Sequence, residues 1–134
     1  MYILLYEIVF VAATEEGFFR KILLSELCGA MKTPYAITLG AIIFAVVHLL
    51  CYNYQSNSLV KFDTMFLFGV FLGTVFIITK SINVTITIHA GQNFLIYFCR
   101  EQIVYMYCVG IVLSLIIILC YVVRRKKNVK KVAK

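Results

Sequence analysis

Ionisable side chains inside long apolar stretches constrain this chain more than any other feature. An ionised side chain at the centre of a bilayer costs about 2.5–3.5 kcal/mol, whereas each Leu, Ile, Phe or Val returns only about 0.3–0.6 kcal/mol. Such costly positions indicate a functional site. The polar residues concerned are Glu15, Glu16, Arg20, His48, His89 and Asn93.

The composition places the chain in a membrane. Hydrophobic residues make up 63% of the 134 residues, whereas soluble domains contain about 45–50%. Because backbone in lipid must satisfy its own hydrogen bonds, the sequence predicts an all-α fold, a polytopic transmembrane bundle of about five helices. No basic residue precedes Glu7, so a cleavable signal peptide is not expected.

The predicted helices are five apolar segments. In the fourth, residues 84–88 alternate like a strand, but an isolated strand cannot satisfy its backbone in lipid, so a helix is favoured. In the third, Gly69 and Gly73 form a face that lets a neighbouring helix approach closely. Thr33 suits the N-cap of the second helix, and residues 53–61 form a polar loop. The predicted helices cover residues 2–30, 34–52, 62–79, 81–98 and 103–123, with a turn at 100–102.

Most of the net charge of +7 lies in the C-terminal tail. A basic run directly after an apolar helix indicates a cytoplasmic anchor on anionic membrane lipid, and no nucleic-acid partner is expected. With this tail inside, the N-terminus lies outside, and Lys32 and Lys80 fall in inner loops. We expect one domain, 1–123, with a basic cytoplasmic tail, 124–134, in the plasma membrane of a prokaryote.

The cysteines are not spaced as a metal or disulfide motif. There are five, with no CxxC pair, and most lie in apolar helices, where cysteine behaves as a small hydrophobic residue. We therefore expect reduced, structural thiols and no zinc bound through cysteine. They are Cys28, Cys51, Cys99, Cys108 and Cys120.

The first polar motif consists of Glu15, Glu16 and Arg20. Glu16 and Arg20 are four residues apart, so they share a helix face and can pair. Glu15 then points about 100° away around the helix. A carboxylate held in a low-dielectric pocket suits a general base near neutral pH. The alternative interpretation is a salt-bridge cluster at the end of a helix in the membrane interface.

The second and third motifs each place a histidine inside an apolar helix. Phe44 lies one turn before His48 and can pack on its ring, although His48 could equally be a satisfied core residue. His89 and Asn93 are one turn apart, so both can donate hydrogen bonds to one point, as an oxyanion site requires. The small Gly91 lets another helix come close. An interhelical hydrogen-bond pair is the alternative.

The three motifs together favour a shared site. If the helices bundle, Glu15, His48, His89 and Asn93 could converge at one depth. They would then supply a base, its partner and two stabilising donors, which is the set of groups needed for attack of water on a carbonyl.

The motifs EExxxR, FxxxH and HxxxN, in this order on successive helices, resemble those of the type II CAAX prenyl endopeptidase and bacteriocin-processing family, also called CPBP or Abi. The resemblance covers about residues 8–96. It implies an intramembrane protease that hydrolyses a peptide bond in a membrane-anchored peptide, with prenylated peptides as candidates. By analogy with the matching motif positions of that family, the resemblance implies that Glu15 and His48 activate the water, while His89 and Asn93 stabilise the oxyanion. Supporting residues are Glu16, Arg20 and Phe44.

On the preferred interpretation, the implied protease requires no cofactor, because a Glu–His pair needs no metal and the chain contains no HExxH motif. The alternative is a metalloprotease with zinc or another divalent metal on Glu15, His48 and His89.

Two features depart from the family pattern. Relatives usually carry additional helices before the first motif, whereas fourteen residues precede Glu15 here. We therefore expect a truncated or minimal chain, or one completed by partner helices or a homo-oligomer. Relatives also often have Gly where Lys21 stands, which affects how closely the first helix packs.

Two other functions stay open at the level of sequence. A catalytically silent relative could give self-immunity to a bacteriocin or bind a membrane partner. A small transport subunit could relay protons through its acids and histidines.

Overall fold

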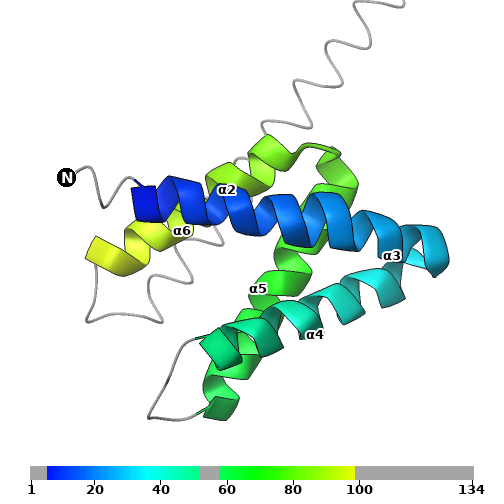
Figure 1. Ribbon diagram of the computed structural model, residues 1–134, viewed down its shortest axis with the longest axis horizontal. Coiled ribbons are helices and arrows are strands. Elements are labelled where there is room, and N and C mark those ends of the chain that lie inside the picture. Colours follow the sequence, from blue (N-terminus) through cyan, green and yellow to red (C-terminus); the bar gives the residue numbers. More distant parts are fainter. Residues whose placement is uncertain (1–5, 52–57, 99–134) are drawn as a thin grey trace, which may run out of the picture. The chain divides into compact units, whose positions relative to one another are not determined.

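The computed structural model describes residues 6–51 and 58–98, which are helical apart from turns at 31–32 and 80–81. The predicted all-α fold is therefore confirmed for these residues. The predicted helix at 103–123, the turn at 100–102 and the tail at 124–134 lie outside them. The elements, labelled in part in Figure 1, are η1 (Tyr6–Phe10), α2 (Val11–Glu16), η2 (Gly17–Leu24), α3 (Ser25–Ala30), α4 (Thr33–Cys51), α5 (Ser58–Thr79) and α6 (Ile82–Phe98).

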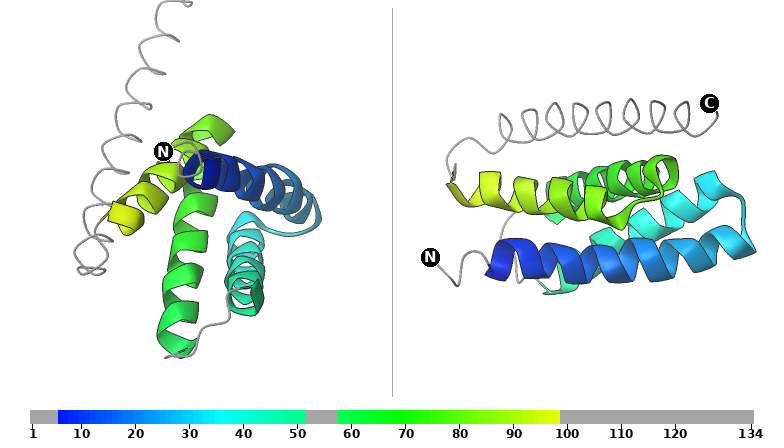
Figure 2. Two further views of the ribbon diagram at one scale, coloured as in Figure 1. Left: turned by 60° about the vertical axis from the view of Figure 1, so that its left-hand side comes forward. Right: turned by 90° about the horizontal axis from the view of Figure 1, so that it is seen from above.

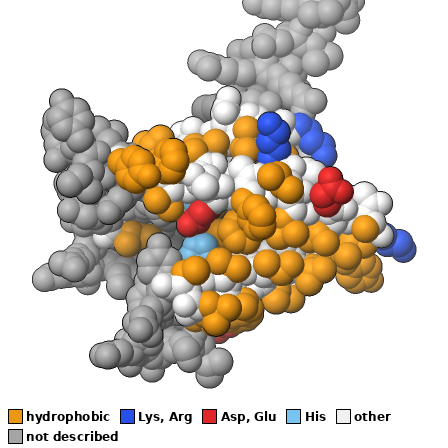
Figure 3. Space-filling view, viewed as in Figure 1, with side chains coloured by type: hydrophobic (Ala, Val, Ile, Leu, Met, Phe, Trp, Pro, Cys, Tyr) orange, Lys and Arg blue, Asp and Glu red, His pale blue; other side chains and the backbone are white. Residues whose placement is uncertain are grey.

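Two of the described helices are long and apolar enough to cross a membrane. They are Thr33–Cys51, with 19 residues, and Phe62–Thr79, with 18 residues, which agree with the second and third predicted spans. Hydrophobic side chains also cover much of the α4 region on the face seen in Figure 3. Exposed apolar side chains on α4 suit contact with lipid. They are Tyr35, Leu39, Ile42, Val46, Val47 and Leu50.

The starts of α4 and α5 and the conformation of residues 84–88 were predicted from the sequence. The loop predicted through residue 61 is wrong at its end, because α5 already begins at Ser58; a helix can extend past its apolar segment into the interface. The second helix begins at Thr33, and the carbonyl of Lys32 accepts hydrogen bonds from the first turn. Residues 84–88 lie within α6, so the predicted helix is confirmed there.

The described residues divide into two compact units, residues 6–13 with 79–98, and residues 14–51 with 58–78. In the first unit, η1 packs against α6, as Figure 2 shows. Lys80 precedes α6 with a φ of 54°, a left-handed conformation that is uncommon for a residue with a Cβ atom. The hydroxyl of Thr79 accepts the backbone N–H of Ser81 at 3.3 Å, which supports this turn.

In the second unit, η2 and α3 form one arm of a hairpin and α4 forms the other (Figure 1). Helix α5 packs on α4 at Gly69, where an added Cβ would lie 3.0 Å from the Cα of Ala41. One turn later, Gly73 faces Ile37 of α4 and Leu24 of η2. The predicted close-packing face of this helix is confirmed at Gly69, because only glycine, whose side chain is a single hydrogen atom, allows the two helices to approach so closely.

Candidate active site

The consecutive elements η1, α2, η2 and α3 form the first helix of the chain, and the first motif lies where its winding changes. Regular α-helix ends at Glu16, and Gly17–Leu24 is wound as a π-helix. The Ser25 hydroxyl donates a hydrogen bond to the carbonyl oxygen of Arg20, five residues earlier, at 3.4 Å. Such π segments are rare and are found frequently at functional sites.

Glu16 and Arg20 form a sealed ion pair. The Nε of Arg20 lies 3.1 Å from Oε2 of Glu16, and the two residues are only 2% and 0% exposed. The pairing predicted from their four-residue spacing is confirmed. Because neither charge reaches solvent, each depends on the other for its stability. The pair is therefore suited to hold structure and unsuited to exchange protons with water.

The guanidinium of Arg20 also rests on aromatic rings. Its Cζ lies 4.8 Å from the ring centroid of Phe44 on α4 and 5.9 Å from that of Phe19. The rings of Phe19 and Phe44 meet edge to face with centroids 5.0 Å apart. Phe68 of α5 lies 6.4 Å from Phe44. The buried Phe44 thus connects the first helix, α4 and α5.

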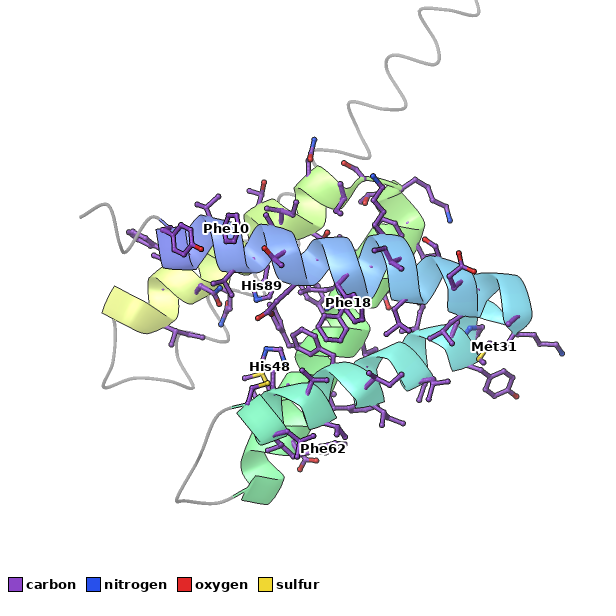
Figure 4. All side chains as sticks on the ribbon, viewed as in Figure 1. Phe10, Phe18, Met31, His48, Phe62 and His89 are labelled. Atoms are coloured by element: carbon purple, nitrogen blue, oxygen red, sulfur yellow. The ribbon has the colours of Figure 1, made fainter. Side chains whose placement is uncertain are left out.

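Glu15 and His48 form a second, more accessible pair. Oε2 of Glu15 lies 3.4 Å from Nε2 of His48, and the side chains are 21% and 14% exposed. His48 points from α4 toward the first helix in Figure 4. The distance slightly exceeds that of a direct hydrogen bond, and catalytic contacts are often long before substrate binds. The structure therefore brings together the predicted base and its predicted partner.

The other nitrogen of His48 determines what this pair can do. Nδ1 lies 2.8 Å from the backbone carbonyl oxygen of Phe44. A carbonyl oxygen can only accept, so Nδ1 carries a proton, and Nε2 is the nitrogen directed at Glu15. A proton on either group can then pass between the carboxylate and the imidazole once the two close to hydrogen-bond distance. Such a pair can take a proton from water and return it later.

The third motif lies on α6, in the other unit. His89 is buried, and Asn93 follows one helical turn later on the same helix face. Gly91 is exposed, and nothing described lies within 4 Å of the position its Cβ would take, so the close helix approach expected there is not observed among these residues. Convergence of His89 and Asn93 with Glu15 and His48 stays a prediction.

Sequence reasoning missed three residues near these motifs. The ring of Phe68 lies against that of Phe44, and its only signal in the sequence is its place directly before Gly69. Ser25 bonds the Arg20 carbonyl, which no sequence pattern indicates. Gln92 is buried, and its Nε2 has no hydrogen-bond partner among residues 6–51 and 58–98. Its position three residues after His89 was the available signal.

The next feature is the supply of possible metal ligands within each unit. In the described part of either unit, no three His, Cys, Asp or Glu side chains gather as a possible metal site. Glu15 and His48 alone supply two ligands, whereas a catalytic zinc usually has three from the protein. The described cysteines, Cys28 and Cys51, are not in a disulfide.

The fold and the site define a helical membrane protein with an acid–imidazole pair held between two helices. The sequence profile described as "Type II CAAX prenyl endopeptidase Rce1-like" matches residues 1–95. The chain therefore belongs to the Rce1-like type II CAAX prenyl endopeptidase family, a CPBP family of polytopic membrane proteins. The matched range contains all three motifs. Neither a curated protein nor a solved structure shows significant similarity to the chain.

Proposed function

We propose that this protein is an intramembrane endopeptidase that hydrolyses a peptide bond in a membrane-anchored peptide. The observation that carries the proposal is the Glu15–His48 pair, with 3.4 Å between Oε2 and Nε2. It is held between two helices, where both side chains are partly exposed and Oε2 of Glu15 itself is buried. Membership of the prenyl endopeptidase family supports the same chemistry.

In the proposed reaction, Glu15 and His48 remove a proton from a bound water molecule. The resulting hydroxide attacks the scissile carbonyl carbon and forms a C–O bond. The carbonyl electron pair moves onto oxygen, and His89 and Asn93 donate hydrogen bonds to this oxyanion. When the intermediate collapses, the C–N bond breaks and the leaving nitrogen takes the proton held by the pair. The products are a carboxylic acid and an amine.

The proposed substrate is a peptide that carries its own membrane anchor. Most of the surface of α4 is apolar, so a substrate that reaches His48 from the lipid must itself partition into the bilayer. A prenyl group on the peptide is one such anchor, and the family description names prenyl endopeptidases. A peptide with an apolar helix as its anchor is the other source to compare.

We propose a metal-free mechanism, since an acid and an imidazole in proton-sharing geometry need no Lewis acid to activate water. Zinc on Glu15, His48 and His89 is the competing assignment. Treatment with a chelator followed by metal analysis of the purified protein separates the two. Metal-free protein that cleaves at the full rate supports the first, and activity that returns only with zinc supports the second.

The proposed topology puts the basic tail in the cytoplasm of a prokaryote and the N-terminus outside. The tail holds Arg124, Arg125, Lys126, Lys127, Lys130 and Lys131, and positive loops stay preferentially on the cytoplasmic side. A reporter that is active only in the cytoplasm, fused after Lys134, should be active. An inactive reporter would reverse the proposed orientation.

The decisive experiment is cleavage in reconstituted vesicles. Wild type, Glu15→Gln and His48→Gln are compared on a prenylated peptide, the same peptide without the prenyl group, and a peptide anchored by an apolar helix. Lys21→Met is the matched control, because Lys21 is an exposed charge on the same helix. The proposal requires that the control cleaves like wild type and that both site variants are inactive. Wild-type rates in both site variants would refute the assigned roles.

A further inference from the structure

We propose that Arg20 is a positioning residue for His48 and that it acts through the ring of Phe44. This inference rests on the proposed function, because it concerns the orientation of the imidazole that shares its proton with Glu15. It assigns to the sealed ion pair a second task beyond holding the first motif in shape. The observations that carry it all lie in the unit formed by residues 14–78.

The first link is the contact between Arg20 and Phe44. The guanidinium carbon lies 4.8 Å from the Phe44 ring centroid, within the range of a cation–π interaction. Both residues are buried, so water does not weaken the attraction. Glu16 holds the other edge of the guanidinium at 3.1 Å and keeps it in place over the ring.

The second link is the contact between Phe44 and His48. Their ring centroids lie 4.1 Å apart with 39° between the ring planes. The same residue accepts the Nδ1 proton of His48 through its backbone carbonyl at 2.8 Å. A Phe44 ring that is held on one side by Arg20 thus closes one face of the imidazole. This restricts the rotation by which His48 would leave the carbonyl.

The consequence concerns which nitrogen faces Glu15. With Nδ1 donating to the Phe44 carbonyl, the neutral imidazole keeps its lone pair on Nε2, which faces Glu15 and can accept a proton from its carboxyl group. If Phe44 relaxes, His48 gains rotamers in which Nδ1 leaves the carbonyl and both tautomers are populated. The contacts that lead from Arg20 to His48 here pass through Phe44, so we assign Arg20 a positioning role.

The test reads the imidazole directly and needs no cleavage. The full-length protein is labelled with nitrogen-15 in its histidine rings and studied in detergent micelles at a pH where His48 is neutral. The chain contains only two histidines, so a His89→Gln variant assigns the His48 signals. Wild type should show a protonated Nδ1 and a bare Nε2 on His48.

The main variant is Glu16→Gln with Arg20→Met, which removes the cation without leaving a buried charge behind. We expect a mixture of both His48 tautomers, a loss of about tenfold in the tautomer ratio. Arg20→Lys keeps a cation near the ring and should retain most of the wild-type signal. Lys21→Met removes a neighbouring exposed charge and should leave the His48 signals unchanged.

A second variant keeps the proposal testable if the first does not fold. Phe44→Leu removes the ring but leaves the backbone carbonyl, so it breaks the link without touching the ion pair. A mixture of tautomers is expected again. The proposal is overturned if either folded variant, Phe44→Leu or the Glu16/Arg20 double variant, keeps the wild-type His48 signals.

The outcome is separable from that of the proposed function. An inactive wild-type protein with the expected tautomer signals would refute the endopeptidase and leave the positioning role intact. An active protein whose His48 signals stay unchanged in the Arg20 and Phe44 variants would refute the positioning role and leave the endopeptidase intact. Where cleavage is measured, loss of positioning should lower kcat and leave KM unchanged.

Discussion

Glu15 and Glu16 are adjacent in the chain, yet their carboxylates lie in opposite environments. Glu16 is fully buried against Arg20 of its own helix. Glu15 is partly exposed and meets His48 of α4. One pair is fully buried and formed within a single helix, whereas the other has partly exposed side chains and is formed between two helices.

The difference shows how a membrane protein can separate structure from chemistry within two consecutive residues. The intrahelical pair depends on spacing along one element and survives small movements of the neighbouring helices. The interhelical pair depends on how α4 lies against the first helix. Perturbations of helix packing should therefore affect the interhelical pair more than the intrahelical one.

The largest expected effect is on the interhelical pair. Glu15→Gln or His48→Gln should lower cleavage of the membrane-anchored peptide by about 10²–10⁴-fold, because each removes a proton acceptor. Neither should unfold the protein, since both side chains are partly exposed. Cleavage rates and circular dichroism of the same preparations check this. Loss of helicity in parallel with activity would remove the distinction between the pairs.

The next effect is on the sealed pair. Arg20→Met should destabilise the protein by about 3–5 kcal/mol, because it leaves the Glu16 carboxylate buried without its cation. Glu16→Gln together with Arg20→Met should be considerably more stable than Arg20→Met alone. Unfolding by denaturant in micelles measures both. Equal stability of the single and double variants would mean that Glu16 is not charged in the folded state.

A change at the contact between α4 and α5 should affect the Glu15–His48 pair but not the Glu16–Arg20 pair, with a smaller loss of stability than Arg20→Met causes. A methyl group at Gly69 would lie 3.0 Å from Cα and 3.1 Å from Cβ of Ala41, so Gly69→Ala must push α4 away. We expect a loss of about 1–3 kcal/mol, as for other overpacked sites, and reduced cleavage. The Glu16–Arg20 pair should be unaffected, because it lies within one helix.

Gly73→Ala is the matched control for Gly69→Ala. Its methyl group would lie 3.4 Å from Cγ2 of Ile37 and 3.6 Å from Cδ2 of Leu24, and both are ends of side chains that can adjust. Stability and cleavage should stay close to wild type. If Gly73→Ala is as harmful as Gly69→Ala, the close approach at Ala41 is not the cause.

The smallest expected effect is at Ser25. Ser25→Ala removes the 3.4 Å hydrogen bond to the Arg20 carbonyl and should cost about 0.5 kcal/mol, since the bond is long and the residue is exposed. Cleavage should not change. Thermal unfolding followed by circular dichroism measures the shift. A loss above about 2 kcal/mol would show that this bond is essential to the winding of η2.

Contacts within one helix could be predicted from the sequence. Four-residue spacing predicts that Glu16 meets Arg20 and that Phe44 packs on His48, and both contacts are present. The chemistry of lipid likewise decides that residues 84–88 are helical in spite of their alternating pattern. These inferences need only the geometry of a helix and the cost of exposed backbone.

Contacts between helices needed the structure. The distance from Glu15 to His48 depends on the packing of two helices, and spacing along the chain does not determine it. The cation–π contact of Arg20 with Phe44 is of the same kind. The π winding of Gly17–Leu24 was also beyond sequence reasoning, because it follows from a one-residue shift in backbone hydrogen bonding that apolar patterns do not report.

This winding has a consequence for how the segment tolerates change. A shift of one residue along a regular helix turns everything after it by about 100°. If Gly17–Leu24 returned to ordinary α-helical winding at its present length, Ser25 and all of α3 would therefore turn to a different side of the hairpin, and a deletion in this stretch would offset part of that turn. Exposed positions such as Phe18, Lys21 and Ile22 should accept many replacements. The winding of this stretch, more than the identity of its exposed residues, should therefore set the side to which α3 points.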